Sequence, residues 1–294
     1  MRWRDLRRST NIVDRRDEGG FGGPGRIIFP RSGAGRTAGI GGAGAIVILL
    51  LALFFGIDPS MILAPDTTTA PDQRVPDTAQ EAELKDFVAA VLGDTEDTWT
   101  SLLEAQGISY RAPQLILFAN AIQSACGFAE AAVGPFYCPP DQQVYLDLSF
   151  FDDMRRKLGA PGDFAAAYVV AHEVGHHVQN QLGIMGKVDE IRAGLGREDA
   201  NMLSVRLELQ ADCFAGIWAK HAQRERNVLE PGDIDEALNA AAAVGDDRLQ
   251  RRSQGYVVPE SFTHGTSEQR ITWFKRGFES GSLRACNTFN AGSL

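Results

Sequence analysis

Twenty consecutive uncharged residues, from Ala38 to Ile57, interrupt an otherwise well-charged chain of 294 residues. A helix of that length rises about 30 Å, enough to cross the hydrocarbon core of a bilayer. A cleaved signal peptide is the main alternative, but its basic segment is normally short, and no clean small-x-small cleavage site follows this run. We therefore expect residues 38–57 to form one uncleaved transmembrane helix.

Charge is distributed unevenly on the two sides of this run. Nine arginines and four acidic residues precede Thr37, although the whole chain has a net charge of −9. The positive-inside rule then predicts a cytoplasmic N-terminus and a periplasmic or extracellular body, anchored in the inner membrane by a single pass. The acidic body would repel a phosphate backbone, so nucleic acid is not an expected partner.

Composition divides the remaining chain into three parts. Residues 1–37 are rich in glycine and arginine and are expected to form a cytoplasmic tail that does not fold alone. Residues 58–78 are rich in proline, threonine and aspartate, which is typical of a linker. The folded domain is therefore expected over residues 79–294, and its oligomeric state is left open.

Apolar periodicity within 79–294 predicts an α+β domain, rich in helices and with a small sheet. Strands are expected over 114–118 and 143–150, with a Gly/Pro-rich loop between them. Helices are expected over 79–105 with a possible break at Gly93 and Asp94, and over about 149–158, 162–182, 200–224, 231–245 and 266–281.

The four cysteines are spread along the body, and no two form a C-x-x-C pair. An even number fits two disulfides in an oxidising compartment, whereas four buried thiols would fit a cytosolic core. Cys126 and Cys138 lie twelve residues apart and would close the predicted loop. Cys213 and Cys286 are then paired by default.

The residues His172-Glu173-Val174-Gly175-His176 form an H-E-x-x-H motif inside a helical, apolar stretch. Histidines four positions apart project from one face of a helix, so both imidazoles can bind one metal ion. Glu173 lies beside them, where it can take a proton from a water at the metal and pass it to a leaving amine. Zinc suits nitrogen and oxygen ligands, and we expect one Zn²⁺ per chain.

A catalytic zinc site usually needs a third protein ligand. Glu208 and Asp212 are four residues apart on a second apolar helix, so Glu208 is the candidate ligand and Asp212 can accept the free ring N–H of His172. The alternative is a pair of surface acids facing Arg206 or Lys220.

The remaining histidines have different surroundings in the sequence. His177 lies about 100° around the helix from its neighbour and is expected to pack or to support the ligands. His221 stands in a polar stretch typical of a solvated surface. His264 precedes a helix and is a candidate to stabilise the oxyanion formed during peptide hydrolysis, with Tyr256 and Arg270 as alternatives.

Several longer stretches resemble the bacterial neutral zinc metallopeptidase family of single-pass membrane proteins. They are MRWRDLRRSTNIVDRR, GPFYCPPDQQVYLDLSFFDDM, GAPGDFAAAYVVAHEVGHHVQNQLGI, RLELQADCFAGIWA and THGTSEQR, which together cover nearly the whole chain. The resemblance implies a zincin fold, with the active-site helix beside a small sheet whose edge strand lies along the substrate cleft. Strand 143–150 is the candidate for that edge, and Glu208 would be the glutamate third ligand of such a zincin.

The function these features favour is a zinc-dependent endopeptidase that hydrolyses extracytoplasmic proteins or peptides. The alternative from another class is a membrane-anchored zinc protein that binds or scaffolds without proteolysis, although such a site would not need the base Glu173. A serine hydrolase is disfavoured because no G-x-S-x-G motif is present. An intramembrane protease is disfavoured because the helix over 162–182 carries too many polar residues after His172.

Overall fold

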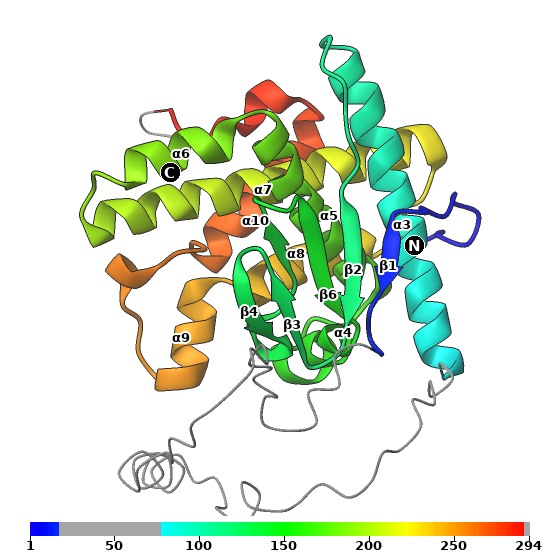
Figure 1. Ribbon diagram of the computed structural model, residues 1–294, viewed down its shortest axis with the longest axis horizontal. Coiled ribbons are helices and arrows are strands. Elements are labelled where there is room, and N and C mark those ends of the chain that lie inside the picture. The colour runs from blue at the N-terminus through cyan, green and yellow to red at the C-terminus, as the bar shows by residue number, and fades with distance from the viewer. Residues whose placement is uncertain (18–77, 291–294) are drawn as a thin grey trace, which may run out of the picture. The chain divides into compact units, whose positions relative to one another are not determined.

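A mixed four-stranded sheet, with helices packed beside it, organises the described part of this computed structural model, residues 1–17 and 78–290 (Figure 1). The strand order is β1-β2-β6-β5, in which the first three strands run parallel and β5 is antiparallel to β6. The strands are β1 (Ile12–Asp14), β2 (Gln114–Phe118), β6 (Gln143–Asp147) and β5 (Phe136–Cys138). The predicted class, α+β with many helices and small sheets, is confirmed.

The predicted strand over 143–150 ends earlier and lies elsewhere in the sheet than expected. Its last residue, Asp147, accepts hydrogen bonds from the backbone N–H groups of Ser149 and Asn120 at 2.9 Å each, and Ser149 begins a helix. Strand β6 pairs with β2 on one side and β5 on the other, so it is an interior strand. The edge strands are β1 and β5, and neither was predicted from the sequence.

The stretch expected to be a loop contains a second, two-stranded sheet. Strands β3 (Ala121–Ser124) and β4 (Gly127–Glu130) pair antiparallel, and a short 3₁₀ turn (Ala131–Val133) leads on to β5. The predicted disulfide between Cys126 and Cys138 is present, with a Cα–Cα distance of 5.8 Å. It joins the tip of this hairpin to the end of the edge strand.

Eight α-helices are found among the described residues, and two of them, α6 and α9, were not predicted. Both are nine residues long and largely exposed, so they contribute little to the apolar core. The helix that ends at Ser280 begins after Thr266, whose side chain forms a capping box with Gln269. The helices are α3 (Ala79–Glu104), α4 (Ser149–Asp153), α5 (Asp163–Gln181), α6 (Ile184–Arg192), α7 (Arg197–Arg226), α8 (Asp233–Ala243), α9 (Asp246–Gln254) and α10 (Ser267–Ser280).

Helix α3 runs without a break through Gly93, where a division was expected. A Cβ atom at Gly93 would lie 2.5 Å from the backbone carbonyl oxygen of Arg7. Glycine is needed there because another part of the chain passes against the helix, and it does not end the helix. The reason is a tertiary contact, which apolar periodicity does not reveal.

Helices α7 and α10 pack closely through two glycines. A Cβ at Gly216 would overlap the backbone of Phe274 on α10, and a Cβ at Gly277 would overlap the backbone of Cys213 on α7. The second predicted disulfide, Cys213–Cys286, is also present and ties α7 to the segment that follows α10. The default pairing of these two cysteines is therefore confirmed.

The first seventeen residues fold with the body, which corrects the expected separate tail. Strand β1, blue in Figure 1, lies beside β2 and α3, and residues of the N-terminal segment belong to the same compact unit as the body. Trp3 is 6% exposed and packs against Phe87 of α3 with ring centroids 5.5 Å apart. The predicted span 38–57 and most of the linker 58–78 lie outside the described residues. Among the described residues, no helix combines the length and apolar character needed to cross a membrane.

Candidate metal centre

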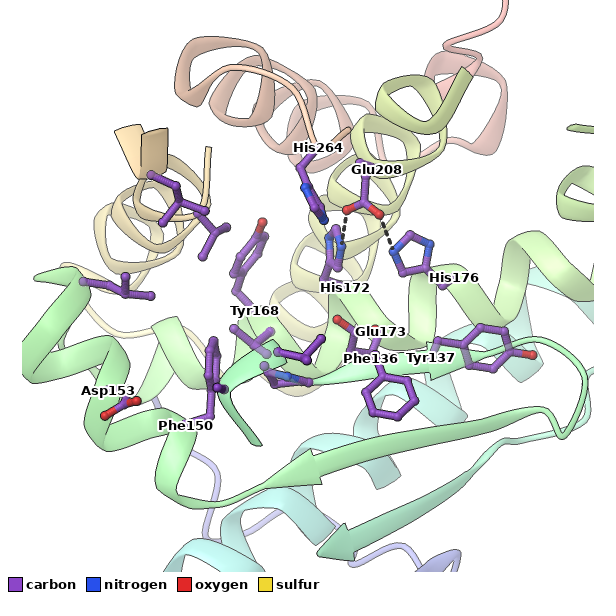
Figure 2. A pocket seen from close by; sticks show the side chains of 18 of the residues that line it. Phe136, Tyr137, Phe150, Asp153, Tyr168, His172, Glu173, His176, Glu208 and His264 are labelled. Carbon is purple, nitrogen blue, oxygen red and sulfur yellow. Dashed lines mark hydrogen bonds and ion pairs between the residues drawn. The ribbon is translucent and has the colours of Figure 1, made fainter. Parts of the chain in front are cut away.

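Helix α5 carries both histidines of the H-E-x-x-H motif into the interior. The turns before the motif are built from small and β-branched residues that are buried, so the helix can run through the core. His172 and His176 are 6% and 8% exposed, and their ring centroids lie 4.8 Å apart. The two imidazoles project from one face of α5, as their spacing predicted (Figure 2).

Helix α7 places Glu208 opposite the two histidines. One carboxylate oxygen lies 3.2 Å from Nε2 of His172 and the other lies 3.3 Å from Nε2 of His176 (Figure 2). The ligand atoms of the three residues all lie within 4.8 Å of one another, so they can hold one metal ion. The helices approach closely here because Gly175 has no side chain: a Cβ there would be 3.0 Å from the carbonyl oxygen of Ala211.

Each histidine is oriented by a hydrogen bond on the ring nitrogen that faces away from Glu208. Nδ1 of His172 donates to Asp212 at 2.8 Å, and Nδ1 of His176 donates to the side-chain oxygen of Gln179 at 2.9 Å. The amide nitrogen of Gln179 is committed to the carbonyl of Leu207, so its oxygen must face His176. Both Nε2 atoms are therefore left as acceptors that can bind a metal.

Asp212 is held in turn by Arg270 and Tyr168. The Arg270 guanidinium donates to both carboxylate oxygens at 2.8 and 2.9 Å, and the Tyr168 hydroxyl donates to one of them at 2.5 Å. All three side chains are at most 3% exposed. Burial opposes charge on Asp212, but Arg270 and His172 outweigh it and keep the pKa of the carboxyl below its usual range.

The acidic surroundings favour positive charge at the position of His172. Burial alone would lower the pKa of His172, but the charge and hydrogen bond of Asp212 outweigh it, and Glu208 adds to them. The pKa of His172 is raised to about 10. This part of the molecule therefore has the electrostatics of a cation site, with Glu208 and Asp212 supplying the negative charge.

The three candidate ligands open onto a cavity of about 520 Å³ that Glu173 also lines. The Glu173 side chain lies beside the histidines, and within the described residues no hydrogen-bond or ion-pair partner is found for its carboxylate (Figure 2). It is only 8% exposed. A nearly buried acid that faces a cavity and lacks a partner is well placed to take a proton from a molecule in that cavity.

His264 lines the same cavity from the side opposite α5 (Figure 2). Its Nδ1 lies 3.2 Å from Asp246, which also accepts hydrogen bonds from the backbone N–H groups of Thr263, His264 and Gly265. The hydrogen bond to Asp246 raises the pKa of His264, and burial opposes this only in part. Asp246 thus holds the loop and favours a protonated imidazole at the cavity.

Other residues considered from the sequence lie elsewhere. His177 is buried, as expected, and its Nδ1 lies 3.1 Å from the hydroxyl of Tyr137 on the edge strand. His221 is 5% exposed, so the prediction of a solvated histidine was wrong; it lies against Glu225 and the carbonyl of Gly281. Tyr256 is 63% exposed and is absent from the cavity lining.

A second group of carboxylates, Asp163, Asp233 and Glu236, also has metal-like spacing. The amino group of Met1 lies 2.8 Å from Asp163 and 3.4 Å from Asp233, and Glu236 accepts a hydrogen bond from the backbone N–H of Phe164. These acids already have partners within the protein, so this group is a structural cluster.

Three functional residues were missed by sequence reasoning. Gln179 lies three residues after His176 and Tyr168 lies four residues before His172, so helical spacing was a signal for both. Asp246 gave no such signal, because it is eighteen residues from His264 and meets it only through the packing of α9.

Comparison with known proteins identifies a family. The model of the family described as "Putative neutral zinc metallopeptidase" matches residues 1–289.

The chain belongs to this family.

Two further proteins are similar to this chain over most of their length. The Escherichia coli K12 protein printed as "Uncharacterized protein YpfJ" is 47% identical over 292 residues, which is 98% of this chain and 99% of that protein. The Mycobacterium tuberculosis H37Rv protein printed as "Uncharacterized protein Rv2575" is 40% identical over 262 residues, covering 83% and 86% of the two chains. No solved structure matches this chain significantly. The family match includes the N-terminal seventeen residues, in agreement with their place in the fold.

Proposed function

We propose that this chain is a zinc-dependent endopeptidase of zincin type that cleaves proteins or peptides outside the cytoplasm. One observation carries the proposal: three metal-binding side chains converge on a cavity that an unpaired, nearly buried Glu173 also faces. A purely structural zinc site would have a fourth protein ligand and no need for such a base. Membership of a zinc metallopeptidase family supports the same conclusion.

His172, His176 and Glu208 would hold one zinc ion. Two imidazole nitrogens and one carboxylate oxygen, with one side open to a cavity, fit the ligand preference of a catalytic zinc. When bound, zinc supplies Lewis-acid polarisation of the scissile carbonyl and lowers the pKa of a water molecule to about 7. Asp212 and Gln179 keep the two imidazoles in the tautomer that this binding requires.

Glu173 acts as the general base. Its carboxylate accepts the proton of the attacking water and then gives that proton to the amine that leaves. Both transfers need the acid to face the cavity without a competing partner, which is the arrangement found in the described residues. Proton transfer of this kind contributes roughly 10²–10⁴-fold to a rate.

His264 stabilises the negative charge that develops on the carbonyl oxygen. It stands across the cavity from the ligand helix, and Asp246 holds it with the loop. A protonated imidazole donates a stronger hydrogen bond to an oxyanion than a neutral one. Arg270 is unsuited to this role because Asp212 already engages its guanidinium on both oxygens.

The substrate would lie along β5, whose outer edge has no strand partner among the described residues. Such an edge can align an extended peptide by main-chain hydrogen bonds. Tyr137 fixes this strand to α5, because its hydroxyl contacts both His177 and Asn180. Beside the ligands, the cavity is walled by apolar side chains, which favour cleavage next to an apolar residue; they are Phe150, Leu158, Val169, Val244 and Leu249.

The two disulfides favour an oxidising compartment for the body. In a bacterium this is the periplasm or the exterior of the cell. A protein or peptide substrate would then be extracytoplasmic, and the apolar run 38–57 remains our candidate for contact with the membrane.

The test uses the full chain, purified in mild detergent, as wild type and as Glu173→Gln. Bound metal is measured by elemental analysis, and hydrolysis is followed on casein and on a quenched peptide library. We expect about one zinc per chain in both proteins and hydrolysis only in the wild type. Zinc without hydrolysis in the wild type would favour a binding or scaffold protein, and a folded sample without metal would refute the proposal.

A further inference from the structure

The N-terminal segment, Met1–Asp17, satisfies a buried acid of the body. Glu96 on α3 is 7% exposed, and its carboxylate accepts hydrogen bonds from Arg7 at 2.7 Å, Ser9 at 2.6 Å and Asn11 at 2.8 Å. Every partner found for this carboxylate within the described residues comes from the N-terminal segment. A buried carboxylate left without partners is costly, so the body needs the segment to satisfy Glu96.

The surface of α3 is shaped for the same segment. Gly93 lies one turn before Glu96, and its lack of a side chain lets the backbone of Arg7 and Ser9 pass against the helix. Glycine inside a helix costs about 1 kcal/mol relative to alanine, so a compensating contact is expected. That contact is present: the Ser9 N–H donates to the carbonyl of Ala89 at 2.9 Å, and the Arg7 guanidinium donates to the carbonyl of Gly93 at 2.9 Å.

The segment also completes the sheet and the core. Strand β1 pairs in register with β2 from Ile12 opposite Leu115 to Asp14 opposite Leu117, and Trp3 is part of the main apolar core. Without the segment, β2 would present an unpaired edge and the core would lose a buried indole. The segment is thus an integral part of the folded body.

The arginines that suggested a cytoplasmic N-terminus have structural partners. Arg4 pairs with Glu83 and Arg8 pairs with Asp86, both on α3. Exposed pairs of this kind contribute little energy, but they give the basic residues a role within the fold. The positive-inside rule counts every arginine equally, whether or not it pairs with an acid of the fold. The rule therefore overstates how strongly these arginines indicate a cytoplasmic N-terminus.

We propose that the N-terminal segment and the body lie on the same side of the membrane, and that the apolar run 38–57 does not separate them. A single crossing would place about 30 Å of hydrocarbon between Glu96 and its partners. Exchange of the segment between two copies would not remove this constraint, because the contacts still join the segment to a body. The proposal replaces the expectation from charge that the N-terminus and the body lie on opposite sides of the membrane, and it does not depend on peptidase activity.

The sidedness of the two parts is measured with a membrane-impermeant maleimide on bacteria whose outer membrane has been opened. Thr10→Cys places a thiol on the segment and Ser101→Cys places one on α3 of the body, and both positions are exposed. The unchanged protein is the background control because all four native cysteines are in disulfides. We expect the two thiols to be labelled together.

Each outcome decides the proposal. Labelling of both thiols in these cells places both parts outside the cytoplasm, and labelling of both only after the inner membrane is permeabilised places both inside. Either result supports the shared side. Labelling of Ser101→Cys with protection of Thr10→Cys, until the inner membrane is opened, would overturn it.

A second measurement tests docking of the segment in the membrane-bound protein. Gly93→Ala adds a methyl group that would meet the Arg7 carbonyl, whereas Gly186→Ala on α6 adds one in open space. We expect trypsin to cut the N-terminal arginines of the Gly93→Ala protein at least about tenfold faster than those of wild type, equivalent to about 1.4 kcal/mol of lost docking. Gly186→Ala should resemble wild type. Equal cleavage of all three proteins would show that the segment is not docked.

Discussion

Nδ1 of His172 donates a hydrogen bond to Asp212 over 2.8 Å, and Asp212 is held on both oxygens by Arg270. The Asp212 carboxylate therefore links Arg270 on α10 to the candidate ligand His172 on α5. At His172 the negative charge of Asp212 outweighs the repulsion from the Arg270 guanidinium, so a buried arginine can lie close to a candidate cation site. This relationship makes Asp212 a positioning residue for the candidate zinc site.

Replacing Asp212 with asparagine should weaken zinc binding. An amide keeps the shape but removes the charge that faces Arg270, and it is a weaker acceptor for the His172 N–H. We expect zinc affinity to fall about 10–100-fold, measured by competition with a chelator. Unchanged zinc binding by Asp212→Asn would contradict the role given to this residue.

The hydrogen bond that His264 donates to Asp246 should control the alkaline limit of activity. This hydrogen bond raises the pKa of His264. The charge of Glu208 adds to the effect and the charge of Arg270 opposes it. The imidazole therefore stays protonated to a higher pH than an ordinary histidine does. The rate should fall as pH rises through that raised pKa. In Asp246→Asn the pKa is lower, so the fall should begin at lower pH. Rate profiles over pH on one peptide substrate measure this, with zinc content checked at each pH.

His264→Ala should lower the turnover number while leaving bound zinc unchanged. Loss of an oxyanion donor commonly costs about 10²–10³-fold in turnover. The alkaline limit described for Asp246→Asn should then disappear, because the titrating group is gone. A His264→Ala protein with normal turnover would exclude this residue from catalysis and return attention to other groups that line the cavity.

The close approach of α5 and α7 at Gly175 should be required for the ligand geometry. Gly175→Ala puts a methyl group 3.0 Å from the carbonyl oxygen of Ala211, one turn from Glu208. We expect a loss of roughly 1–3 kcal/mol in stability, together with weaker zinc binding, because the helices must separate. Thermal unfolding with and without zinc measures both effects. Gly186→Ala, in open space on α6, is the matched control and should be neutral or slightly stabilising.

The disulfide between Cys126 and Cys138 should stabilise the cavity wall. It closes a loop with a sequence separation of 12 that contains β4 and the turn leading to β5. Replacing both cysteines with serine should cost about 3 kcal/mol by the loop-entropy estimate. Denaturant unfolding in oxidising buffer tests this, and reduced wild-type protein should resemble the double variant. A change well below 1 kcal/mol would mean that the hairpin is held by its other contacts.

Much of the candidate site could be predicted because its residues sit at helical spacing on two helices. The pairs His172 with His176 and Glu208 with Asp212 are each four residues apart, so a local rule placed each pair on one face. Their mutual approach was inferred from chemistry: a buried Glu and Asp need partners, and a metal site needs a third ligand. The Cys126–Cys138 disulfide was predicted from the short sequence separation of the two cysteines. The Cys213–Cys286 disulfide was predicted because only these two cysteines remained.

The features that were missed depend on contacts between distant parts of the chain. The order of strands in the sheet is such a feature, so β6 was taken for the edge and β5 was not identified. The N-terminal segment was taken for a free tail because its arginines resemble a membrane signal, and their partners Glu83 and Asp86 are more than seventy residues away. Gly93 was taken for a helix end because the residue that it contacts, Arg7, is also far away in the sequence.

The pairing of β1 with β2 also sets an order of events during biosynthesis. Ile12 leaves the ribosome roughly a hundred residues before its partner Leu115, which at ordinary translation speed is a delay of about 5–20 seconds. Until α3 and then β2 have been synthesised, the basic segment has neither helix nor strand to dock against and is available to chaperones. The protein therefore cannot fold in the order in which it is made: its first strand enters the sheet only after β2 has been synthesised.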